Sequence, residues 1–158
     1  MELVARAEPV LVTRARRRVA EHATRCGASD DQSLVIELLT SEIVTNAVVH
    51  AVEGGEIRIQ AGDSDGTFTV SVRDESASPP EVRHPRPSDP HGRGLQVVER
   101  LAASWGVLAE PAGKSVWFSV ELDTAEPSPP ARSAAAPHHS RDRRTDGLLN
   151  YVPRPRCP

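Results

Sequence analysis

The sequence predicts an α+β sandwich, in which helices cover one face of a mixed, mostly antiparallel sheet. Two observations support this class. Apolar residues recur at helical spacing through most of the first 52 residues, and two pairs of alternating segments follow, each pair joined by a short turn. At 158 residues the chain has room for one domain with its own core. We expect residues 1–123 to form that domain.

Two helices are expected first. Pro9 suits the first turn of a helix near residues 9–26. Asp30 or Asp31 can cap a second helix that runs to about Val52.

Four strands are expected as two hairpins, with a third helix near residues 94–104 between them. Apolar and polar residues alternate in each strand, and residues 62–66 are rich in glycine and aspartate, as turns are. The expected strands span residues 56–60, 67–72, 105–108 and 115–122.

Composition excludes several classes of partner and site. The chain has 19 Lys and Arg against 22 Asp and Glu, a formal net charge of -3, so no attraction to nucleic acid or to a membrane surface is implied. We see neither an apolar run long enough for a bilayer nor an apolar signal segment, and we expect a cytoplasmic protein. Residues 124–158 contain seven of the 14 prolines and too little apolar surface to offset the entropy of ordering, so we expect a disordered tail.

The segment Glu42-Ile-Val-Thr-Asn46-Ala-Val-Val-His50 carries three polar groups at spacings of four inside an apolar helix. Glu42 and Asn46 therefore lie one above the other on one stripe, and His50 lies near its edge. This pattern is typical of a helix that lines a pocket. The spacing alone also allows a solvated hydrogen-bonded pair, with His50 placed at a helix end that favours cations.

Asp74 ends a predicted strand and opens a loop. A carboxylate there can accept a hydrogen bond from the exocyclic amine of adenine, or it can simply cap a turn. Residues 75–91 form a long connection with five prolines, a length typical of lids. The connection leads into Gly92-Arg93-Gly94 directly before a helix, where backbone amides can approach a phosphate; a flexible joint is the other interpretation.

In this order, and with the segment GKSVWF at residues 113–118, the motifs resemble those of the Bergerat-fold ATPases: gyrase, heat-shock chaperones, sensor histidine kinases and MutL. More narrowly, the chain resembles the small anti-sigma-factor serine kinases, which implies a Bergerat-type α/β sandwich. Asn46 would then hold Mg²⁺ on the phosphates of ATP, and Glu42 would act as general base. Asp74 would accept the adenine amine, and Ser115 stands where the family often has Thr near that aspartate. The resemblance also implies that the phosphates are bracketed by Gly92, Arg93, Gly94 and Leu95, and that His50 lines the pocket.

The resemblance implies a regulator that phosphorylates a Ser or Thr on an anti-anti-sigma (STAS-type) partner and sequesters a sigma factor. The alternative is a non-catalytic, nucleotide-gated binding module of the same fold. Two departures from the family stand out. The glycines that usually follow the adenine-binding aspartate are absent after Asp74. The N-terminal strand looks truncated, which leaves the expected homodimer open.

Overall fold

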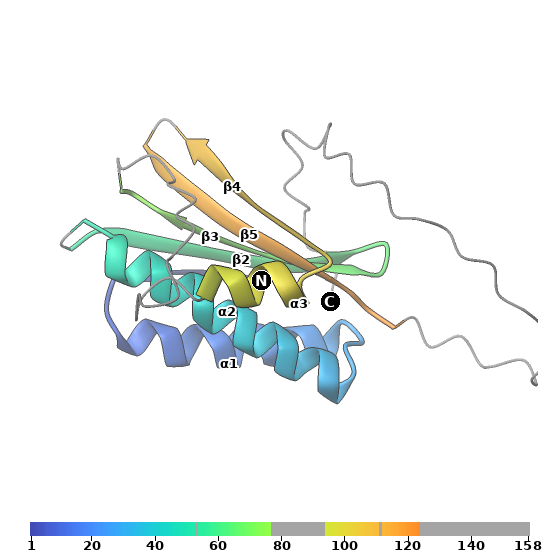
Figure 1. Cartoon of the computed structure of the whole chain (residues 1–158). Helices are drawn as coiled ribbons and strands as arrows, with labels where there is room; N and C mark the ends of the chain where they lie inside the picture. Colours follow the sequence, from blue (N-terminus) through green and yellow to red (C-terminus); the bar gives the residue numbers. More distant parts are fainter. Residues whose placement is uncertain (53, 77–93, 111, 124–158) are drawn as a thin grey trace, which may run out of the picture.

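The computed structural model describes residues 1–52, 54–76, 94–110 and 112–123 (Figure 1). In these residues five strands form one antiparallel sheet with the order β1-β2-β3-β5-β4. Three helices lie together on one face of the sheet (Figure 1). The predicted α+β sandwich is therefore confirmed. The elements are β1 (Glu2–Arg6), α1 (Val10–Arg25), α2 (Asp30–His50), β2 (Glu56–Ser64), β3 (Thr67–Asp74), α3 (Gly94–Leu101), β4 (Ser104–Glu110) and β5 (Gly113–Glu121).

Strand β1 was not among the four strands that the alternation of residues predicted, and only the resemblance to the family pointed to an N-terminal strand, in truncated form. It pairs with β2 from Glu2 opposite Gln60 to Arg6 opposite Glu56. Five residues alternate too briefly to identify a strand on their own, and the pairing with a distant segment decides the conformation. The side chain of Leu3 is buried in the core, so even this short edge strand contributes apolar contact.

Strand β2 is also longer than expected, because the turn that ends it is tighter. The first hairpin turns at Asp65 and Gly66, whose φ angles are 53° and 75°. Two consecutive residues with positive φ match the right-handed twist of a hairpin, and Asp-Gly is a favoured pair there. Gly62, expected in the turn, instead pairs with Thr69 inside the sheet.

Helix α2 is capped by Ser29 and not by either of the two aspartates that follow it. Ser29 has an extended backbone, and its hydroxyl accepts a hydrogen bond from the backbone N–H of Gln32 at 3.3 Å. The Gln32 side chain in turn accepts the N–H of Ser29 at 3.0 Å, which completes a capping box. Asp30 and Asp31 lie in the first turn, where negative charge favours the helix dipole. The helix ends at His50, two residues earlier than expected.

The core lies between the helices and the sheet, and α2 forms its centre. Ile36, Leu39, Ile43 and Val44 of α2 are fully buried. Of the described helices, α2 alone has the length and apolar composition that a membrane crossing requires, contrary to our expectation from the sequence. Core helices of soluble proteins share this length and composition, and the burial of these four side chains accounts for part of the apolar composition of α2, while Leu34, Leu38 and Val49 of the same helix are exposed.

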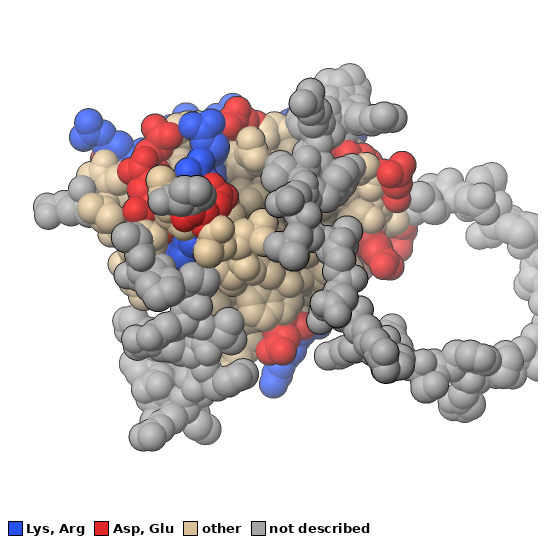
Figure 2. Space-filling view, turned by 90° about the horizontal axis from the view of Figure 1, so that it is seen from above, with Lys and Arg blue, Asp and Glu red and all other residues tan. Residues whose placement is uncertain are grey.

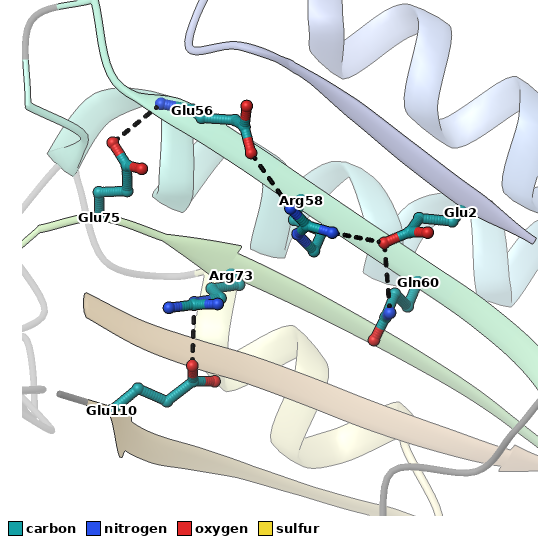
Figure 3. Close-up of polar contacts among 7 residues, drawn as sticks. All are labelled: Glu2, Glu56, Arg58, Gln60, Arg73, Glu75 and Glu110. Carbon is teal, nitrogen blue, oxygen red and sulfur yellow. Dashed lines mark hydrogen bonds and ion pairs between the residues drawn. The ribbon is translucent and has the colours of Figure 1, made fainter. Parts of the chain in front are cut away.

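The uncovered face of the sheet carries charges of both signs. Arg58 lies 2.9 Å from Glu2 and 3.4 Å from Glu56, while Arg73 lies 2.9 Å from Glu110 (Figure 3). Seen from above, acidic and basic side chains lie beside one another at the upper left of the described surface, while its middle carries neither (Figure 2). This face therefore presents no large field of a single sign.

Candidate functional site

The chain path brings the second half of α2 and the end of β3 to the same end of the molecule. Helix α2 ends at His50, and β2 begins a few residues later at Glu56. The second residue of β2, Ile57, pairs with Asp74, the last residue of β3. Both ends lie at the left of Figure 1. The polar residues predicted from two separate motifs are thus brought to one side of the fold.

Glu42 lies where the N-terminus of α3 meets α2. A Cβ atom placed on Gly94 would overlap the carboxylate of Glu42 and would lie 3.4 Å from its Cδ atom. The start of α3 therefore packs directly against the Glu42 side chain, and a larger residue at position 94 would require the end of that flexible side chain to shift. The structure therefore brings together two of the residues predicted from the sequence, a carboxylate and the start of a helix that follows a glycine-rich segment.

Asn46 is one turn along α2 from Glu42, and both residues are partly buried. The intervening residues Ile43 and Val44 are fully buried in the core. The two polar side chains consequently share the margin of the helix, beside its buried face.

Asp74 is buried, with 1% of its surface exposed. Its Oδ1 atom accepts hydrogen bonds from the backbone N–H of Ser76, at 2.9 Å, and from the Ser76 hydroxyl. Its Oδ2 atom is buried and has no hydrogen-bond partner among the described residues. An unsatisfied buried acceptor costs about 1–3 kcal/mol, more when charged, so such an atom calls for a partner from outside the described residues.

The residue opposite Asp74 on β5 is Lys114. Its ammonium nitrogen lies 3.8 Å from Asp74 Oδ2, an ion-pair contact that is too long for a hydrogen bond. Gly113 makes this approach possible, since its φ is 141° and a Cβ atom there would overlap the backbone carbonyl of Asp74.

Ser115 does not lie beside Asp74, and this expectation was wrong. Ser115 pairs with Arg73 and faces the uncovered side of the sheet. Its hydroxyl donates to Glu110 at 2.5 Å, the same carboxylate that contacts Arg73. Successive side chains of a strand point to opposite faces, so a shift of one residue reverses the face. The sequence could have indicated this. Val116 and Phe118 point to the core, and Lys114 lies two and four residues before them, so its side chain points to the same face.

The remaining predicted residues are less fully placed. Gly92 and Arg93 lie outside the described residues. Leu95 is partly buried in the first turn of α3, and His50 is exposed at the end of α2. The roles of His50, Leu95 and the two undescribed residues stay predictions.

The donor set fits a magnesium ion carried by phosphates. No group of three or more His, Cys, Asp or Glu side chains able to hold a metal occurs in the described part of the chain. Mg²⁺ commonly keeps several waters and binds through substrate phosphates with one or two protein oxygens. A single carboxamide oxygen, that of Asn46, is compatible with this mode of binding.

The order of the strands, the layer of helices on one face and the buried carboxylate of Asp74 are features that this chain shares with a known protein family. The family model described as histidine kinase-like ATPase domain matches residues 5–120, and the chain belongs to this family. Among curated proteins, the chain is similar to the anti-sigma F factor of Halalkalibacterium halodurans. The two are 28% identical over 104 residues, which cover 58% of this chain and 71% of the relative.

Solved structures show the same fold. The structure of the RsbU and RsbW domains of Rv1364c from Mycobacterium tuberculosis matches with a TM-score of 0.58 and 20% identity. That match covers 77% of this chain but only 31% of the mycobacterial chain. The catalytic domain of histidine kinase ThkA matches with a TM-score of 0.50 and 16% identity, over 77% of this chain and 97% of that domain.

Proposed function

We propose that this protein binds Mg-ATP, phosphorylates a Ser or Thr on an anti-anti-sigma partner protein, and sequesters a sigma factor. The observation that carries the proposal is the buried Oδ2 atom of Asp74, which is an acceptor with no hydrogen-bond partner among the described residues. This atom lies at the end of the sheet toward which the second half of α2 runs. An exocyclic amine of a bound base satisfies such an atom. The similarity to an anti-sigma F factor supports the choice of partners.

Asn46 and Glu42 of α2 have separate tasks in this proposal. Asn46 contributes the oxygen that holds the metal ion, and a bound Mg²⁺ neutralises charge on the phosphates. Glu42 takes the proton of the acceptor hydroxyl as the phosphoryl group moves to that oxygen and ADP leaves. The N-terminus of α3, which lies beside the Glu42 carboxylate, favours negative charge there.

The test is incubation of the full chain with ATP labelled on its γ-phosphate and with candidate anti-anti-sigma proteins, beside a pull-down with sigma factors. We expect label on a Ser or Thr of one partner and capture of one sigma factor. Glu42→Gln should abolish labelling. Glu37→Gln is the matched control, since Glu37 lies on the same helix and pairs with Arg16 at 3.5 Å. Failure of the protein to bind ATP would refute the proposal, and capture of a sigma factor without any labelling would favour the gated binding module.

A further inference from the structure

Lys114 is a buried lysine that the proposed function has not used. Only 7% of its surface is exposed, which is rare for lysine unless the charge is paired. Among the described residues its ammonium group contacts Asp74, and at 3.8 Å the two groups attract each other without sharing a hydrogen bond. Within the described residues, the ammonium group therefore keeps its donors and Asp74 Oδ2 keeps its acceptor capacity.

The carboxylate of Asp74 and the ammonium group of Lys114 are held side by side. Asp74 is fixed by two hydrogen bonds from Ser76 to its other oxygen. Lys114 is fixed by strand pairing directly opposite, next to Gly113, whose backbone packs against that of Asp74. The site therefore offers an acceptor and, beside it, a cationic donor.

This order complements one edge of adenine. On that edge the exocyclic amine is a donor and the neighbouring ring nitrogen N1 is an acceptor. Guanine carries the reverse order there, with an oxygen acceptor and an N1–H donor. We propose that Lys114 donates a hydrogen bond to N1 of the bound adenine while Asp74 accepts from the amine, which makes Lys114 a specificity-determining residue. This inference rests on the proposed binding of ATP.

A purely structural role for Lys114, as a counter-charge to Asp74, predicts something different. A counter-charge attracts the carboxylate of Asp74 equally whichever ring atom lies next to the amine. Contact with N1 instead couples residue 114 to one atom of the ligand. The comparison of ATP with 1-deaza-ATP isolates that atom, because the analogue keeps the amine and replaces N1 by C–H.

The experiment is calorimetric titration of both nucleotides, with Mg²⁺, into the wild-type chain, Lys114→Met and Lys114→Arg. We expect the wild type to bind ATP about 10- to 140-fold more tightly than 1-deaza-ATP, the size of one charge-assisted hydrogen bond. Lys114→Met should reduce this ratio to near one, and Lys114→Arg should retain part of it. Ser119→Ala is the control, since Ser119 lies on the same strand with its hydroxyl directed to the backbone of Ser104 at 3.5 Å, and its ratio should equal that of the wild type.

The outcomes separate the two proposals. A wild type that binds no ATP refutes the proposed function. A wild type that binds both nucleotides equally, or a ratio that Lys114→Met leaves unchanged, refutes only the role of Lys114. A thermal melt determines whether each variant folds. If Lys114→Met does not fold, the comparison of the two nucleotides on the wild type can still refute the role of Lys114.

Discussion

Replacement of Asp74 by asparagine tests the end of the site that would receive the base. Because Ser76 donates two hydrogen bonds to Oδ1, the amide oxygen of the asparagine takes that place and its NH₂ group replaces Oδ2. A donor then faces both Lys114 and the amine of the nucleotide. A hydrogen bond to a charged group contributes about 1.5–3 kcal/mol, which corresponds to about 10- to 140-fold weaker binding of ATP. Stability should fall as well, since Lys114 loses its carboxylate partner.

Calorimetric titration with Mg-ATP, at a temperature well below the melting transition of each variant, measures the effect. Asp65→Asn is the matched control, because it makes the same chemical change in an exposed turn whose positive φ asparagine tolerates. Its affinity should equal that of the wild type. Undiminished ATP binding by folded Asp74→Asn would refute the assignment of Asp74 to the base, as would equal binding of ATP and GTP by the wild type.

The other variants address the metal, the proton transfer, the core and the tail. Asn46→Ala should abolish the Mg²⁺-dependent part of ATP binding, measured by titration with and without the ion; binding that stays Mg²⁺-dependent would exclude Asn46 as the ligand. Glu42→Ala should retain ATP binding and lose transfer to the partner in the labelling assay. His22 is 5% exposed, and burial, followed by the charges of the N-terminus and Arg25, lowers its pKa below the ordinary 6.5. Its neutral form is therefore favoured in the folded chain, so stability is fully present above pH 6.5 and is lost as the pH falls through the lowered pKa. Urea unfolding between pH 8 and pH 5 should show this loss, and His22→Gln should flatten it. Deletion of residues 124–158 should leave the thermal melt unchanged, and a lower melting temperature would show that the tail contributes to the fold.

The main elements could be predicted from the sequence because their periodicity is long enough to be distinctive. Helix α2 and the two hairpins carry many apolar residues in register with the period of a helix or a strand. Strand β1 could not be predicted, because its five residues become a strand only through pairing with β2. The cap of α2 could not be chosen either, since Ser29, Asp30 and Asp31 are all good capping residues and the backbone conformation decides among them.

Within the site, the error at Ser115 was one of register. The motif placed a polar residue near Asp74, and the alternation of β5 assigns that place to Lys114. Alternation with the buried residues Val116 and Phe118 could have revealed this. The hydrogen bonds from Ser76 had no comparable signal, because they depend on how the chain turns after β3.

The two ends of the proposed site are held by different kinds of structure. Asp74 is held by paired strands on both sides and by Ser76, so the acceptor for the base belongs to the sheet. Glu42 instead meets Gly94 at the start of α3, an eight-residue helix in which Val98 alone is fully buried. A helix this short depends on packing for its stability, since its own nucleation is unfavourable. If the proposed function holds, recognition of the base should be insensitive to small movements of α3, whereas the alignment of Glu42 with the phosphates should depend on them. The proposal therefore predicts that variants at the start of α3 can lose phosphoryl transfer while they retain nucleotide binding.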